Sequence, residues 1–177
     1  KSGHFSTLEH VSYTFAVDGV SRALTHQLVR HRLASFNQQS QRYVKFTKGV
    51  ETVTPHTIEE NEEAHRVFDE AIEAVIEGYQ KLLDMGIPAE DARYLLPNAA
   101  ETKIVITMNI RELLHFFSLR CCNRAQWEIR EMAHKMFELV KPTAPYIFMD
   151  AGAPCVRGTC PEGKMTCGNP YPKVVRD

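Results

Sequence analysis

The stretch RHRLASFNQQSQRYV, residues 30–44, combines positive charge with amide and hydroxyl side chains. Arg30, His31, Arg32 and Arg42 place four basic groups within 13 positions, and the residues between them are rich in Ser, Asn and Gln. Whatever fold the chain adopts must bring these groups to a ligand, or to carboxylates from elsewhere in the sequence.

Ion pairs within the stretch do not explain its arginines. No Asp or Glu lies between Asp18 and Glu51. Arginine binds phosphate through two parallel hydrogen bonds, and Ser, Gln and backbone amides commonly complete such a site. The stretch therefore predicts a nucleotide as the ligand, with a helix end stabilised by salt bridges as the alternative.

The spacing of these residues leaves two local structures open. On a continuous helix, Gln27, Arg30 and His31 share one face, whereas Arg30 and Arg32 point about 200° apart. The residues Ser35–Arg42 are richer in amides and hydroxyls than a helix interior usually is. We therefore expect the helix to end near Arg32 and a loop to follow it.

Hydrophobic periodicity predicts the remaining elements. An alternating pattern predicts a short strand that Asp18 and Gly19 end, and helical spacing predicts several helices, the first capped by Ser21. The predicted strand covers Ser12–Val17. The first predicted helix begins at Ser21, and a short one runs from Pro88 past Arg93 to near Pro97. The other predicted helices cover Thr57–Met85, Glu101–Leu119 and Arg124–Val140.

The composition is that of an ordinary soluble chain. Its 177 residues, 44% hydrophobic and 24% charged, favour one domain. A total of 21 Lys and Arg against 22 Asp and Glu argues against long nucleic acid or an anionic membrane as partner. No apolar run approaches the ~20 residues of a membrane span, so we expect a cytoplasmic protein. Because residue 1 is Lys rather than Met, we expect that a tag or an upstream segment preceded it.

A second cluster, MNIRELLHFFSLRCCNRAQWEIR at residues 108–130, mixes polar donors with apolar residues. Arg111 and His115 are four apart and share a helix face, while Leu and Phe residues supply the buried face. Pairing of the later arginines with nearby glutamates is the alternative use of these charges. The polar side chains of the cluster include Asn109, Arg111, His115, Arg120, Arg124 and Gln126.

The five cysteines do not fit a disulfide framework, because their number is odd, and they indicate a reducing compartment. Cys121 and Cys122 have no obvious catalytic partner, and we interpret them as a buried thiol pair. Cys155, Cys160 and Cys167 lie in a Gly- and Pro-rich tail, where their spacing is a poor match to common zinc sites. We expect free thiols there, with zinc as the alternative.

The segment GHFSTLEH, residues 3–10, also contains potential metal ligands in His4, Glu9 and His10. Helix capping and hydrogen bonds in the core are the commoner uses of such residues, so we expect no metal. The sequence has none of the glycine-rich phosphate-binding motifs GxGxxG or GxxxxGK[ST], and no GxSxG.

Four segments together resemble the flavin-dependent thymidylate synthases, the thymidylate synthase complementing protein family. The first is Arg-His-Arg followed by seven residues and Ser, here RHRLASFNQQS, which extends to Arg42. The others are GHFSTLEHVSYTF, PAEDARYLLPNAAETK and NIRELLHFFSLRCCNRAQWEIR. The resemblance implies a family domain over residues 1–150, lacking the family's usual N-terminal part, and an irregular cysteine-containing tail over residues 151–177.

The resemblance implies reductive methylation of dUMP to dTMP. FAD is the cofactor, NADPH reduces it, and methylenetetrahydrofolate gives the one-carbon unit. The implied fold is α+β: long helices packed with a small antiparallel sheet, in a single domain of a homotetramer. In the family several subunits build each site, which implies that Arg30 and Arg32 face different ligands or different chains. The implied partners are small molecules, with neither nucleic acid nor membrane among them.

Residue roles follow from the same resemblance. Arg120 matches the arginine that stabilises the ionised imide of uracil, and a guanidinium can do so without transferring a proton because its pKa exceeds ~12. Gln38 matches a position that is Glu in some members of the family, and His115 matches a position that is Asn in some members. Implied FAD-binding residues are Ser6, Arg30, His31, Arg32, Gln38, Asn109, Arg111 and His115. Implied dUMP-binding residues are Gln27, Leu28, Val29, Arg30, Gln38, Gln39, Ser40, Gln41, Arg42, Arg93 and Arg120.

A non-catalytic nucleotide- or RNA-binding module is the competing hypothesis, since the same arginines could hold a nucleotide without chemistry. The near-neutral net charge of -1 and the lack of an exposed aromatic stacking pattern disfavour it.

Overall fold

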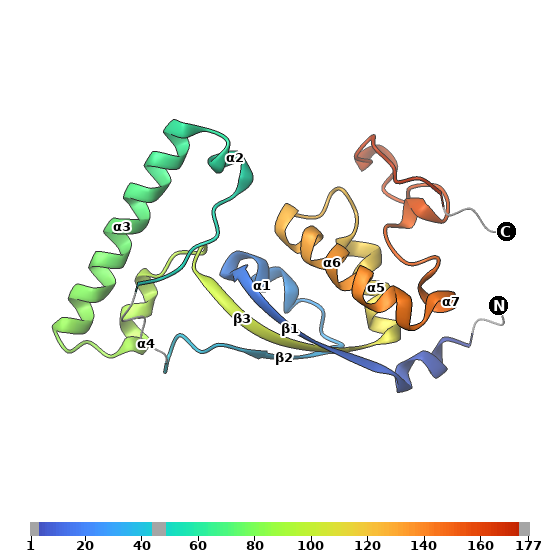
Figure 1. Cartoon of the computed structure of the whole chain (residues 1–177), viewed down its shortest axis with the longest axis horizontal. Coiled ribbons are helices and arrows are strands. Elements are labelled where there is room, and N and C mark those ends of the chain that lie inside the picture. Colours follow the sequence, from blue (N-terminus) through green and yellow to red (C-terminus); the bar gives the residue numbers. More distant parts are fainter. Residues whose placement is uncertain (1–3, 44–48, 174–177) are drawn as a thin grey trace. The chain divides into compact units, whose positions relative to one another are not determined.

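The computed structural model describes residues 4–43 and 49–173, so Lys1, Gly3 of the segment GHFSTLEH and Val44 of the opening stretch lie outside it. The strands are β1 (Ser12–Ser21), β2 (Ala34–Gln38) and β3 (Glu101–Asn109). The α-helices are α1 (Arg22–Leu28), α2 (His56–Glu59), α3 (Glu62–Asp84), α4 (Ala89–Ala92), α5 (Ile110–Arg120), α6 (Trp127–Val140) and α7 (Pro145–Phe148) (Figure 1). Short 3-10 helices are η1 (Phe5–His10), η2 (Arg93–Leu95), η3 (Lys141–Thr143), η4 (Pro154–Val156) and η5 (Gly163–Met165).

The three strands form one sheet in the order β1-β3-β2, with β3 in the centre. The hydroxyls of Thr14 and Thr107 lie 2.9 Å apart, and Lys103 donates to Asp18 over 2.8 Å. Residue numbers thus rise along β1 as they fall along β3, which is the antiparallel arrangement, and the whole sheet is antiparallel. The predicted α+β combination of helices with a small antiparallel sheet is confirmed.

The prediction of one helix over Glu101–Leu119 is wrong in its first half. Residues 101–109 form the central strand, and their side chains alternate between buried and more exposed positions. Thr102, Ile104, Ile106 and Met108 are all buried. These alternate residues make a period of two, which is typical of a strand with one face on the core. The helix begins only at Ile110.

The first strand is longer than predicted. It runs to Ser21, so Asp18 and Gly19 do not end it; Gly19 takes a positive φ of 70° within the strand. Because glycine has no Cβ, this backbone conformation costs it little. The predicted cap is confirmed, since the Ser21 hydroxyl accepts a hydrogen bond from the backbone N–H of Leu24.

The first helix ends at Leu28, four residues before the end near Arg32 that the sequence predicts. The prediction that it does not continue through Ser35–Arg42 is confirmed. The loop predicted for Ser35–Arg42 is wrong for its first residues, which belong to β2. Pairing with β3 stabilises an extended backbone here, as the hydrogen bond from Gln39 N to Lys103 O shows at the end of β2. Residues 41–43 form a turn.

The helix predicted over Thr57–Met85 is divided into α2 and α3. Asn61 takes an extended conformation between them, and its side chain accepts a hydrogen bond from Ala64 N. An Asn at this position satisfies one of the unpaired N–H groups at the start of α3. The predicted helix after Pro88 is present as α4 with Arg93 in the following 3-10 turn, and the last predicted helix is present as α6.

The chain divides into two compact units, here called unit 1 and unit 2. Unit 1 comprises Lys1–Phe15, Gln27–Phe36 and Ile106–Asp177, and unit 2 comprises Ala16–His26 and Asn37–Val105. In unit 1, α5 packs against η1 and α6; in unit 2, α3 packs against α4 and η2. None of the helices in the described ranges is long and apolar enough to cross a bilayer.

Each unit has its own core. In unit 1 the ring of Phe117 meets those of Phe116, Phe137 and Phe148 at centroid distances of 5.8, 5.4 and 6.3 Å. These tilted aromatic contacts anchor α5 to α6 and α7. In unit 2 the largest buried side chain on α3 is Tyr79, which is 1% exposed.

Candidate active site

Helix α5 presents one line of side chains at a spacing of four residues: Glu112, Phe116 and Arg120. Residues at this spacing lie above one another on the same face of a helix. Asn109 starts the helix by accepting a hydrogen bond from Glu112 N over 2.9 Å, which fixes the first turn. The hydrophobic residues of α5 fix its rotation, because Leu113 and Phe117 are fully buried.

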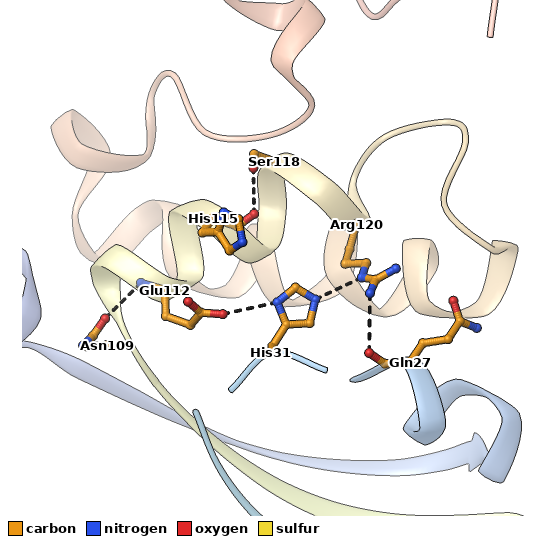
Figure 2. A network of polar contacts seen from close by, with 7 residues as sticks. All are labelled: Gln27, His31, Asn109, Glu112, His115, Ser118 and Arg120. Carbon is orange, nitrogen blue, oxygen red and sulfur yellow. Dashed lines mark hydrogen bonds and ion pairs between the residues drawn. The ribbon is translucent and has the colours of Figure 1, made fainter. Parts of the chain in front are cut away.

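His31 lies against this line. It follows the turn after α1 and is only 5% exposed. Its ring packs edge-on against Phe116 with a centroid distance of 4.9 Å. The two ring nitrogens therefore point toward the two polar members of the line, one at each end (Figure 2).

The hydrogen bonds of His31 specify where its proton lies. Arg120 donates from Nε to His31 Nε2 over 3.0 Å, and His31 Nδ1 lies 3.2 Å from Glu112 Oε1. A guanidinium N–H only donates, so His31 Nε2 must accept and carry no proton. A neutral ring then carries its proton on Nδ1 and donates it to the carboxylate of Glu112.

The electrostatics agree with a neutral imidazole. The pKa of His31 is lowered to about 4, chiefly by burial and also by the nearby Arg120 and His115. Burial raises the pKa of Glu112, while His115 opposes that rise. Burial also lowers the pKa of Arg120, which remains a cation because the ordinary value for arginine is above 12.

Arg120 is held at a second point. Its Nη2 donates to the backbone carbonyl of Gln27 over 3.4 Å (Figure 2). Within residues 4–43 and 49–173, the guanidinium makes these two contacts through Nε and Nη2, and Nη1 makes no hydrogen bond. Two fixed points orient the planar group before any ligand binds.

A cavity of about 240 Å³ joins the Arg-His-Arg motif to α5. Four residues predicted at the flavin, Arg30, His31, Arg32 and His115, line it together with Arg120. Arg30 and Arg32 are exposed, and neither forms an ion pair with a carboxylate of the described chain. Two unpaired guanidinium groups beside a cavity suit an anionic ligand such as a pyrophosphate.

The other predicted flavin residues of unit 1 lie near the start of α5. Arg111 forms an ion pair with Glu9 of η1, and Asn109 caps α5. Arg111 and His115 line a further cavity of about 500 Å³, to which Phe5 contributes. Ser6, next to Phe5, is exposed. His115 therefore borders both cavities.

Most of the residues predicted to bind the nucleotide belong to unit 2. Arg42 donates to the Glu90 carboxylate over 2.5 Å, and Arg93 donates to the Glu90 backbone carbonyl over 3.0 Å. The Ser40 hydroxyl accepts hydrogen bonds from the backbone N–H groups of Arg42 and Tyr43. Arg42 and Arg93 thus both contact Glu90, and Ser40 holds the turn that carries Arg42.

The glutamines of the motif are used differently. Gln38 donates from Nε2 to the hydroxyls of Thr25 and Thr102, over 3.0 and 3.4 Å, so its amide nitrogen points into the core of unit 2. The Gln39 carbonyl accepts from Arg22, and Gln41 lies half-buried in the following turn.

Two further predicted positions flank the end of α1. Leu28 is fully buried, and its carbonyl accepts a hydrogen bond from His31 N, whereas Val29 is 44% exposed.

Comparisons with known proteins identify the family of the chain. Residues 1–146 match the family model described as thymidylate synthase complementing protein. The chain belongs to this family. A flavin-dependent thymidylate synthase of Geobacter sulfurreducens is 59% identical over 167 residues, covering 94% of this chain and 72% of the relative. The one of Nitratidesulfovibrio vulgaris is 52% identical over 182 residues, covering 97% of this chain and 74% of the relative. The one of Clostridium tetani is 50% identical over 182 residues, covering 94% of this chain and 73% of the relative.

Two residues that contact the predicted site residues were not predicted from the sequence. Glu112 lies eight positions before Arg120, and this spacing, which puts both residues on one helix face, is the signal that could have found it. Arg22 was not considered; it donates to the Gln39 carbonyl over 2.7 Å. Burial and the charge of Arg93 lower the pKa of Arg22.

The cysteines of this family member lie mostly around one cavity in unit 1. The cavity has a volume of about 360 Å³ and is bordered by Arg120, Arg124 and four thiols, those of Cys122, Cys155, Cys160 and Cys167. Burial raises the pKa of Cys121 to about 12, so that thiol stays protonated. Only Cys121 of the predicted buried pair is buried; Cys122 is half-buried. In the part of the chain that the structure describes, no three metal-ligating side chains are close enough to hold a metal.

Proposed function

We propose that the chain catalyses reductive methylation of dUMP to dTMP, with FAD as cofactor and with NADPH and methylenetetrahydrofolate as co-substrates. Membership of the thymidylate synthase complementing protein family supports the reaction. The observation that carries the proposal to individual residues is the position of Arg120, anchored by His31 beside the cavity of the Arg-His-Arg motif.

Arg120 is proposed to act on the uracil ring. An arginine cation stabilises negative charge on the ionised imide, and this makes carbon 5 of the ring more nucleophilic. The anchoring of Nε and Nη2 leaves Nη1 to meet the substrate, so the group needs little reorganisation as charge develops. Gln27 is the proposed neighbour on the ring, since its carbonyl already holds Arg120.

Arg30, Arg32 and His115 are proposed to hold the flavin. When bound, FAD supplies the hydride of the reduction. The chain's own contribution is to bind the anionic part of the cofactor with unpaired guanidinium groups and to place it beside Arg120. Three residues near the start of α5 are proposed to border the cofactor: Ser6, Asn109 and Arg111. Gln38 is proposed to border it at the Arg-His-Arg motif.

Ser40, Arg42 and Arg93 are proposed to bind the phosphate of dUMP. The contact of Arg42 with the Glu90 carboxylate supports this, because a phosphate is an anionic oxygen acceptor of the same kind, and Arg93 contacts the same residue through its backbone carbonyl. We further propose a cytoplasmic homotetramer, in which more than one subunit contributes to each site.

The visible absorption spectrum of the purified protein, titrated with dUMP, is the direct test. A yellow protein whose flavin spectrum changes on adding dUMP, and which forms dTMP with NADPH and methylenetetrahydrofolate, is the expected result. A colourless protein that cannot be reconstituted with FAD contradicts the proposal. Tight, salt-sensitive binding of oligonucleotides without binding of dUMP would instead favour the nucleic-acid-binding alternative.

A further inference from the structure

Glu112 is a buried carboxylate to which neither the motif nor the resemblance assigns a role. Only 4% of its surface is exposed, and its Oε1 lies 3.2 Å from His31 Nδ1. We propose that Glu112 is a positioning residue that keeps His31 in the Nδ1–H tautomer, so that His31 Nε2 can anchor the Arg120 guanidinium. The catalytic consequence rests on the function proposed above for Arg120; the tautomer does not.

Helix capping is the ordinary use of a glutamate at this position. An Asn that starts a helix, followed by Glu three residues later, commonly forms a box in which the glutamate turns back to the first backbone N–H. One of the two hydrogen bonds of this box is present, because the Asn109 side chain accepts from Glu112 N. The Glu112 carboxylate, however, reaches His31 (Figure 2). Its position in the first turn still favours a negative charge there, through the helix dipole.

The direction of the hydrogen bonds requires an acceptor at the position of Glu112. Arg120 Nε can only donate, so it selects the ring form whose Nε2 lone pair is free. That form has a proton on Nδ1, in a buried place where a missing acceptor is costly. The carboxylate supplies the acceptor, and its charge balances that of Arg120 across the neutral ring.

Loss of the acceptor changes the balance between the two tautomers. With nothing to accept from Nδ1–H, His31 can move its proton to Nε2. Two N–H donors, Nε2–H and Arg120 Nε–H, then face each other over the 3.0 Å that now separates the two nitrogens. The guanidinium must shift, and a displacement of about 1 Å in a catalytic group can cost about 10²-fold in rate.

Three groups that affect its ionisation surround His31. Glu112 faces Nδ1 and Arg120 faces Nε2, both from α5, and the ring of His115 lies 6.1 Å away. Of the three, only Glu112 lies within hydrogen-bonding distance of Nδ1. The tautomer therefore depends on two bonds, the donation from Arg120 to Nε2 and the acceptor that Glu112 offers to Nδ1–H, whereas the low pKa of His31 depends chiefly on burial.

The test measures the His31 tautomer directly in the full-length protein. Nitrogen-15 chemical shifts of the imidazole distinguish protonated from unprotonated ring nitrogens, and the resonances of His31 are assigned by their disappearance in His31→Gln. At pH 7 the wild type is expected to show a protonated Nδ1 and an unprotonated Nε2. A protonated Nε2 in the wild type overturns the proposal, whatever the enzymatic activity is.

Glu112→Leu and Glu112→Gln form a matched pair. The Gln carbonyl still accepts from Nδ1–H, so Glu112→Gln should keep the tautomer and lose only a few-fold in kcat. Glu112→Leu should lose the single-tautomer pattern and about 10²-fold in kcat, with FAD still bound and KM for dUMP changed much less. Unchanged shifts and kcat in Glu112→Leu contradict the proposal. A wild type that makes no dTMP refutes the proposed function, while the shifts still decide the tautomer.

Discussion

Two arginines that are each predicted to bind dUMP, Arg120 in unit 1 and Arg42 in unit 2, are held in opposite ways. Arg120 is half-buried and bonded to the buried His31 and to a backbone carbonyl. The Arg42 side chain is 54% exposed and pairs with Glu90, which is 43% exposed. The Arg42 guanidinium also lies 5.2 Å from the centre of the Tyr43 ring. One arginine is fixed before a ligand arrives, and the other has a partner that a ligand can replace.

The difference follows from the surroundings of each group. Exposed ion pairs are worth about 0–1 kcal/mol, because water and salt screen them. Hydrogen bonds in a buried network are stronger, and a broken one leaves a polar group without water. Fixed orientation suits stabilisation of charge during a reaction, whereas exchangeable pairing suits capture of an anion from solution.

Removal of the fixed arginine has the largest expected effect. Arg120→Ala should lower kcat at least about 10²- to 10³-fold, as loss of one preorganised donor in an active site usually does. The flavin spectrum should persist, since Arg30 and Arg32 remain. Steady-state formation of dTMP and the absorption spectrum of the same sample are the measurements.

Arg120→Lys is the matched variant, because it keeps the charge and removes the planar group that His31 and Gln27 hold. We expect it to be nearly as impaired as Arg120→Ala. Full activity in Arg120→Lys would mean that charge alone matters and that the anchoring has no catalytic value. Loss of FAD from Arg120→Ala would contradict the assignment to uracil.

The buried imidazole predicts a pH dependence of stability. Folding lowers the pKa of His31 from its ordinary value of 6.5 to about 4, so between these values the unfolded chain binds a proton that the folded protein excludes. The free energy of unfolding should therefore fall as pH decreases from about 6.5 to 4. Below pH 4, His31 should cause no further fall. His31 should contribute about 2 kcal/mol to the difference between pH 7 and pH 4.5.

Denaturant unfolding at these two pH values measures that contribution. His31→Gln should lose it, while His115→Gln, which alters an exposed neighbour, should keep most of it. An equal pH dependence in His31→Gln and in the wild type would show that the ring is not buried neutral.

The exchangeable arginine should affect affinity more than turnover. Arg42→Ala should raise the KM for dUMP about 10-fold or more, which corresponds to one lost charge-assisted hydrogen bond. Arg66→Ala, which removes an exposed arginine from α3, is the control and should change neither KM nor kcat. A loss of kcat without a change in KM would place Arg42 with Arg120 as a fixed group.

Removal of the partner of Arg42 gives the smallest expected effect. Glu90→Gln should change the free energy of unfolding by less than about 1 kcal/mol, since the pair is exposed. It should also strengthen dUMP binding a few-fold, because the phosphate no longer competes with a carboxylate. Equilibrium titration at two salt concentrations tests this, and weaker binding in Glu90→Gln would mean that Glu90 positions Arg42 for the ligand.

The sequence by itself determined the family, through motifs that need no structure to be read, and it determined the helices whose apolar spacing is regular. The cap at Ser21 and the ending of the first helix before Ser35–Arg42 also followed from local chemistry, because each depends on residues close in the chain, although the helix ends four residues before Arg32. The sequence also shows that the arginines of the motif have no carboxylate neighbours along the chain, and this absence predicted a ligand.

Only the tertiary structure decided β3 and the pairing of the charged groups. Residues 101–109 alternate with a period of two, but they run directly into the helical pattern of residues 110–119, and it is the pairing with β1 and β2 that sets the boundary between strand and helix. Glu112 and His31 are 81 positions apart, and Arg42 and Glu90 are 48 apart. Contacts at such separations depend on how the whole chain packs. Burial then decides which partner is fixed, because removing water makes one hydrogen bond obligatory and leaves the other exchangeable.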